Sequence, residues 1–203
     1  DRDNINYFPA TINDHAFVEV DGVGSAGGDT TVTGESNDIT ATVLFGDDTK
    51  WGFSYDKADS DSWFNIMWGS GDMGIKGGLI SSSEDADAEG NSGFNFAYGQ
   101  NFSWGELGVG LVSGSHNAAG AFNNDQMDYW LNWRGDLGFW IFDQSKASLM
   151  MTDDGSDNTS MTMGFDMFTH MDAGGADVLF GMGVGYTSNA NVGTWNYDSD
   201  TDV

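Results

Sequence analysis

Large apolar residues alternate with small or polar residues along most of the chain. In the segment 178–186, three glycines alternate with the large residues Val178, Phe180, Met182, Val184 and Tyr186. Successive side chains of a β-strand point to opposite faces of the sheet. The pattern therefore predicts a strand with one bulky apolar face and one face of small residues.

The same period of two recurs between residues 38 and 187, and no segment keeps the 3.6-residue period of a helix. It predicts about 12 strands (between about 10 and 14), joined by turns rich in Gly and Asp and by longer polar loops. After a tight turn at Gly135-Asp136, Leu137, Phe139 and Ile141 are expected to share one face of a further strand. The expected fold is all-β and antiparallel, with an up-and-down order of strands.

Three parts of the chain differ in pattern. Residues 1–37 are expected to form an N-terminal segment with a short first strand and a long loop. Residues 38–187 carry the strands of the sheet. Residues 188–203 are expected to form an acidic tail or an incomplete final strand.

Two architectures place alternating antiparallel strands side by side: a soluble sandwich with its apolar faces inside, and a membrane barrel with its apolar face outside. The faces opposite the aromatic residues are rich in Gly, Ser, Asn and Thr, whereas the exterior of a sandwich carries long charged residues. Aromatic residues also cluster near strand ends, as in an interfacial girdle. Both features favour the transmembrane β-barrel.

Charge narrows the functions that remain. The 203 residues include 32 Asp and Glu against 6 Lys and Arg, which gives a formal net charge of -26. This excludes nucleic acid as a partner, because phosphate binding needs clustered Lys and Arg. The chain has no cysteine, so no disulfide or thiolate metal site can form.

The chain resembles the bacterial outer-membrane β-barrel proteins of porin type over about residues 38–187, in architecture rather than in a specific motif. The resemblance implies the outer membrane as location, a lipid bilayer as partner, and homo-oligomers as a further assembly. Tyr7-Phe8-Pro9-Ala10 is similar to the Asn-Pro-Ala element of the fatty-acid-transporter type of barrel, but Phe8 replaces the Asn. Many such barrels end on an aromatic residue, whereas Asp202-Val203 ends this sequence, which suggests an incomplete final strand.

Two sets of residues are expected to carry the function. Charged residues facing the lumen would set ion selectivity or form ion pairs inside a plugged barrel; they are Lys50, Lys76, Asp128, Arg134 and Asp166. Aromatic residues on the apolar faces would form the membrane belt; they are Trp51, Phe53, Tyr55, Phe94, Phe96, Tyr98, Phe139, Phe165, Phe180 and Tyr186.

Acidic loops offer oxygen ligands for calcium, although acid runs in polar loops are usually only solvated. The spacing of Asp85, Asp87 and Glu89 matches the opening of an EF-hand loop, but Phe96 stands where the twelfth-position Glu is needed. The EF-hand is therefore rejected. Looser calcium sites remain open at Asp85, Asp87 and Glu89, and at Asp153, Asp154 and Asp157. No other cofactor is implied.

Enzymatic activity is not expected, because the sequence contains no nucleophile elbow, phosphate loop or zinc-ligand helix. The expected function is a passive channel for cations and small polar solutes, or a purely structural barrel. The alternatives are a secreted or surface acidic β-sandwich that binds a partner or a carbohydrate, and a self-assembling structural β-protein.

Overall fold

The alternating segments form strands in the computed structural model, which describes residues 2–21, 39–58, 61–82, 92–115, 126–153, 159–189, 192–198 and 201–202. β-Branched and aromatic residues favour these extended segments, and Gly and Asp break them at the turns. The strands are β1 (Phe17–Asp21), β2 (Ile39–Phe45), β3 (Thr49–Ala58), β4 (Asp61–Ser70), β5 (Met73–Ser82), β6 (Ser92–Phe102), β7 (Gly105–Ser115), β8 (Gln126–Gly135), β9 (Gln144–Asp153), β10 (Thr159–Ala173), β11 (Ala176–Asn189), β12 (Val192–Asp198) and β13 (Thr201–Asp202).

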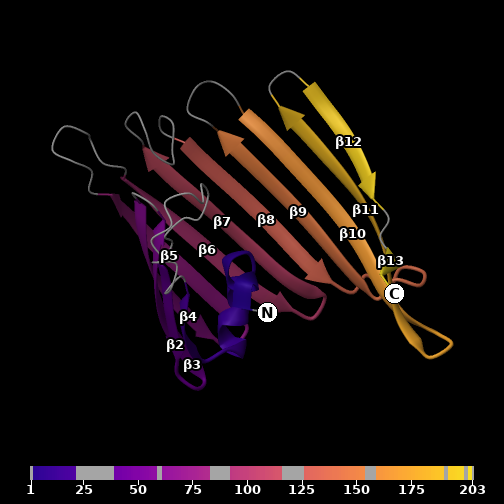
Figure 1. The fold of residues 1–203 in the computed structure, drawn as a ribbon, viewed down its shortest axis with the longest axis horizontal. Coiled ribbons are helices and arrows are strands. Elements are labelled where there is room, and N and C mark those ends of the chain that lie inside the picture. The colour runs from indigo at the N-terminus through magenta and orange to yellow at the C-terminus, as the bar shows by residue number, and fades with distance from the viewer. Residues whose placement is uncertain are drawn as a thin grey trace, which may run out of the picture.

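All described strands belong to one antiparallel sheet, in which β1 to β12 follow one another in chain order (Figure 1). The short β13 pairs with β11 beside β12. The all-β, up-and-down architecture expected from the sequence is thus confirmed. The sheet is open in the structure, because β1 and β12 do not pair with each other among the described residues. One sheet also contradicts the two-sheet sandwich.

One expected strand is wrong. Leu137, Phe139 and Ile141 lie in a loop between β8 and β9, where Phe139 and Phe142 form an isolated bridge. The turn predicted at Gly135-Asp136 begins at the correct position, but it spans residues 136–143 instead of two residues. Alternation continues through this loop although no neighbouring strand pairs with it, which is why the pattern alone resembles a strand.

The N-terminal residues identify the two faces of the sheet. Two short 3-10 helices, η1 (Arg2–Asn6) and η2 (Pro9–Asp14), lie on one face of the sheet (Figure 1). η2 packs against β3 to β7, and η1 packs against η2. We call that face of the sheet the inner face and the opposite one the outer face. Ile5 and Ile12 bury their side chains there against Leu44 and Met67, with Phe17 beside them.

A row of four glycines receives this N-terminal segment. Gly69, Gly74, Gly99 and Gly108 lie directly opposite one another on β4, β5, β6 and β7. A Cβ atom on Gly74 would lie 1.9 Å from the carbonyl oxygen of Pro9, and a Cβ on Gly108 would lie 2.0 Å from that of Tyr7. The absence of side chains in this row is therefore what allows the helical backbone to approach the sheet.

No helix in the described part of the chain is both long and apolar enough to cross a membrane.

Candidate functional site

A row of charged residues crosses the inner face next to the glycine row. It lies one step nearer to the end of the sheet where the chain turns from β6 to β7 and from β8 to β9, which we call the turn end. The register places Glu106 of β7 opposite Arg134 of β8, Arg134 opposite Lys146 of β9, and Lys146 opposite Asp166 of β10. Side chains directly opposite on one face lie within about 5.5 Å at their Cβ atoms. The row thus places two cations between two carboxylates.

Glu106 and Arg134 form the centre of this row. Both Nε and Nη2 of Arg134 donate to Oε2 of Glu106, at 2.7 and 2.5 Å. The Glu106 side chain is only 8% exposed and that of Arg134 is 37% exposed. The other carboxylate oxygen of Glu106 is buried and has no hydrogen-bond partner among the described residues.

The N-terminal segment covers this ion pair from the inside. The Arg134 guanidinium carbon lies 4.4 Å from the centroid of the Phe8 ring, a cation–π contact that favours the charged arginine. Tyr7 meets Trp130 of β8 edge to face, with 6.0 Å between ring centroids. The pair therefore ties β7 and β8 to the N-terminal segment.

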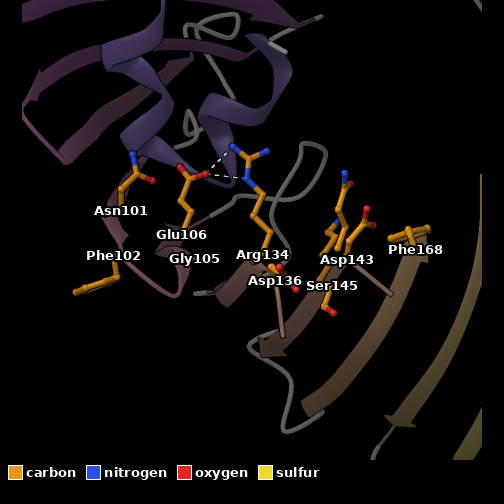
Figure 2. A pocket seen from close by; sticks show the side chains of 12 residues that line it. Asn101, Phe102, Gly105, Glu106, Arg134, Asp136, Asp143, Ser145 and Phe168 are labelled. Carbon is orange, nitrogen blue, oxygen red and sulfur yellow. Dashed lines mark hydrogen bonds and ion pairs between the residues drawn. The ribbon is translucent and has the colours of Figure 1, made fainter. Parts of the chain in front are cut away.

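A pocket of about 610 Å³ opens beside the pair (Figure 2). Figure 2 shows Glu106 and Arg134 on one side of it, and Asp143, Ser145 and Phe168 on the other. Lys146 and Asp136 also line the pocket. Charges of both signs and an aromatic ring thus surround a space that is large enough for a small solute.

A second polar cluster lies farther from the turns. Nδ2 of Asn65 donates to Oγ of Ser54 at 3.0 Å and to Oδ2 of Asp56 at 3.2 Å, while its Oδ1 accepts from Nδ2 of Asn95 at 2.8 Å. Asn65 is 1% exposed, so these bonds replace its lost hydration. The cluster links β3, β4 and β6 across the inner face.

Replacing Asn65 by alanine is expected to lower the free energy of unfolding by about 1–3 kcal/mol, because buried partners lose their hydrogen bonds. Urea titration of the detergent-folded protein, followed by tryptophan fluorescence, measures this change. Thr162→Ala on the exposed part of the inner face of β10 is the control, with an expected change within about 0.5 kcal/mol. Equal effects of the two substitutions would show that the Asn65 network contributes nothing.

The lumen residues expected from the sequence occupy alternating positions that the register places on one face. Lys76 donates to Oδ1 of Asn6 and borders a pocket of about 280 Å³ with Asp56. Asp166 and Arg134 belong to the charged row described above. Lys50 lies near the turns and donates to the carbonyl oxygen of Gly46 at 2.6 Å, whereas Asp128 lies toward the other end of β8 beside Gln126. Of these five residues, only Arg134 and Asp166 share one row, two strands apart with Lys146 between them.

The expected belt residues alternate with these positions and lie on the outer face, except Phe139. Trp51, Phe53, Tyr55, Phe94 and Phe96 are exposed, and Tyr98, Phe165, Phe180 and Tyr186 are half-buried. Phe139 is exposed in the loop between β8 and β9.

The acidic residues suggested for calcium fall largely outside the described residues. Asp85, Asp87, Glu89, Asp154 and Asp157 belong to segments that the structure does not describe, and Asp153 ends β9. The described part of the chain contains no group of three or more acidic or histidine residues placed to hold a metal ion.

Three residues of the site were missed by the sequence analysis: Glu106, Lys146 and Phe8. Strand alternation carries the signal for the first two. Glu106 shares a face with Gly108 and Gly110, and Lys146 lies on the face of β9 that Ala147 and Leu149 do not occupy. No comparable signal exists for Phe8, because an irregular segment does not reveal where it docks.

No family model matches the sequence, and no curated protein matches it. The structure is similar to that of OccK1 (OpdK), an outer-membrane porin of Pseudomonas aeruginosa, with a TM-score of 0.59 and 13% identity. A structure of OpdK with vanillate matches with the same values. The match covers 91% of this chain and 58% of the porin, so the chain spans little more than half of its length. Porins are channels and not enzymes.

The alternating pattern predicted a resemblance to outer-membrane porins. This resemblance is confirmed at the level of the fold, because the chain forms a porin-like antiparallel β-sheet.

Proposed function

We propose that the chain forms the wall of a passive channel in a bacterial outer membrane, through which cations and small polar solutes pass without chemical change. The outer face supports this most directly, because it exposes large apolar side chains in strand after strand. A soluble monomer rarely exposes a continuous apolar patch of more than a few hundred Å². The exposed residues include Phe45, Trp51, Phe53, Phe64, Ile66, Leu79, Phe94, Phe96, Tyr129, Leu131, Met163, Met182 and Val184.

In a bilayer the two free edges of the sheet must be paired, because each unpaired backbone group costs roughly several kcal/mol in hydrocarbon. β1 and β12 are the ends of a path of 12 strands with antiparallel neighbours. They therefore run antiparallel to each other, as neighbours in a closed up-and-down barrel do. We propose that the membrane-inserted form has no free edge.

The inner face would line the channel, and the N-terminal segment would narrow it. Glu106, Asp128 and Asp166 offer negative charge there, and Lys76, Arg134 and Lys146 offer an equal number of positive charges. The net charge of -26 of the whole chain supports a negative potential at the entrances, which raises the local concentration of cations.

Planar-bilayer recording tests this function. We expect stepwise ion conductance and, under a gradient of KCl, a reversal potential of the sign that indicates preference for K⁺ over Cl⁻. Because the entrance charges are exposed, the preference should weaken as the salt rises from about 0.1 M to about 1 M, where the Debye length falls from about 10 to about 3 Å.

Variants that neutralise charges of opposite sign test the origin of the preference. Asp128→Asn together with Asp166→Asn is expected to lower the K⁺ preference, whereas Lys76→Gln is expected to raise it. A protein that stays monodisperse in buffer without detergent would contradict the membrane location. An inserted but electrically silent protein would contradict the channel.

A further inference from the structure

A small cavity of about 280 Å³ lies on the inner face, bordered by η1 and by the strands β1 to β5. In one row of its wall, Thr40 lies directly between Asp21 and Asp56. Glu19 and Thr42 belong to the neighbouring row. The volume is below the range of about 300–1,000 Å³ that is usual for drug-sized ligands. The cavity therefore suits a ligand of few atoms.

Negative charge exceeds positive charge in the lining of this cavity. The carboxylates of Glu19, Asp21 and Asp56 border it, together with the ammonium group of Lys76. Nζ of Lys76 donates to the amide oxygen of Asn6, which is neutral. The cavity thus differs from the charged row, where two cations lie between two carboxylates. A concave site with excess negative charge raises the local concentration of cations.

Hydrogen bonds hold the Asp56 carboxylate in place without cancelling its charge. Its Oδ2 accepts from Nδ2 of Asn65 at 3.2 Å and from Oγ of Ser54 at 3.5 Å. Both donors are neutral, so the negative charge of Asp56 remains available to a cation. A group that is already positioned loses less conformational entropy when a ligand binds.

The spacing of the carboxylates favours an extended organic cation over a metal ion. Asp21 and Asp56 lie two strands apart in one row, which places their Cα atoms about 10 Å from each other. Among the residues that the structure describes, no three acidic or histidine side chains are placed to hold one metal ion. A short chain with an ammonium group at each end can reach both carboxylates.

The other residues of the lining match the rest of such a molecule. An ammonium group has three donors and no acceptor, and the hydroxyl groups of Thr40 and Thr42 offer further acceptors. Ile5, Phe17 and Met67 supply an apolar wall, and Ile5 and Met67 are almost fully buried. Methylene groups between the two charged ends would pack on this wall.

We propose that this cavity binds a short aliphatic diamine with both amino groups protonated, one end at Asp21 and the other at Asp56. The inference names a class of solute for the proposed channel, and it rests on that function as far as passage through the channel is concerned. Binding itself needs only the folded inner face.

Isothermal titration calorimetry on the detergent-folded protein tests binding, with butane-1,4-diamine as the probe at neutral pH and low salt. Butan-1-amine, which has the same chain but one charge, and calcium chloride are the comparisons. We expect the diamine to bind about tenfold or more tightly than the monoamine, because its second ammonium group makes a further charge-assisted hydrogen bond. Equal affinity for the two amines, tighter binding of calcium, or no binding of the diamine would each refute the site.

Variants with opposite expected effects locate the binding in the cavity. Asp21→Asn should weaken diamine binding about tenfold or more, through loss of one charge-assisted hydrogen bond. Lys76→Gln removes the cation from the cavity and should tighten binding, a gain that misfolding cannot produce. Asp128→Asn removes a carboxylate from another part of the inner face and should leave the affinity unchanged. Equal losses in Asp21→Asn and Asp128→Asn, or no gain in Lys76→Gln, would overturn the inference.

Planar-bilayer recording separates the cavity from the channel. Butane-1,4-diamine added on one side should interrupt the K⁺ current of the parent protein, and should do so less in Asp21→Asn. A K⁺ current that the diamine leaves unchanged would refute the inference while the proposed channel stands. Calorimetric binding to a protein that conducts no ions would support the cavity and refute the channel.

Discussion

Replacing Arg134 by alanine is expected to lower the free energy of unfolding by about 2–3 kcal/mol. The substitution leaves the Glu106 carboxylate, 8% exposed, without the cation that compensates its lost hydration. Removal of one partner from a fully buried pair costs about 3–5 kcal/mol, and we expect less here because Arg134 is 37% exposed. The loss of the Phe8 contact adds to the cost. Urea titration in detergent measures the change.

A double-mutant cycle separates the pair from its surroundings. Arg134→Gln with Glu106→Gln removes both charges, and the double variant should be more stable than Arg134→Gln alone. Lys146→Ala removes the neighbouring exposed cation and should change stability by no more than about 0.5 kcal/mol. If Arg134→Ala behaved like Lys146→Ala, the pair would have no structural role.

Replacing Gly74 by alanine is expected to displace the N-terminal segment from the inner face. The new Cβ would lie 1.9 Å from the carbonyl oxygen of Pro9 and 2.9 Å from the nitrogen of Ala10. Both atoms are backbone, so no side chain can rotate to relieve the clash. We expect a loss of about 1–3 kcal/mol, the usual cost of overpacking, and faster hydrogen exchange in residues 4–14.

Gly77 supplies the matched control, because it lies on the outer face of the same strand. A Cβ at Gly77 would find its nearest atom, the carbonyl oxygen of Asn95, at 3.8 Å. Gly77→Ala should therefore leave both stability and exchange near those of the parent. The proposed seat of the N-terminal segment would be wrong if Gly74→Ala left exchange in residues 4–14 unchanged.

Alternation predicted the strands because each of them has unlike faces. In β3 the pattern predicts both the strand and the orientation of its residues, with Trp51, Phe53 and Tyr55 on one side and Gly52 and Ser54 on the other. The pattern failed at Leu137, Phe139 and Ile141, where the residues alternate but no neighbouring strand pairs with them. Hydrogen bonding between strands is a long-range property that the period of two cannot encode.

The site was predictable one strand at a time but not as a whole. Alternation placed Arg134 and Asp166 on the inner face, yet their shared row depends on the register of four strands. The covering of Arg134 by Phe8 depends on the docking of an irregular segment that has no repeating pattern. The selectivity roles of Lys50, Lys76, Asp128, Arg134 and Asp166 remain predictions.

The docked N-terminal segment implies an order of events during folding. Asn6 and Lys76 are 70 residues apart in the chain, and Tyr7 reaches as far as Gly108 on β7. Closing such long loops costs more entropy than pairing consecutive strands. The surface that receives the segment exists only when β4, β5, β6 and β7 already lie side by side. The N-terminal segment therefore docks after these four strands have paired, and its docking marks their correct register.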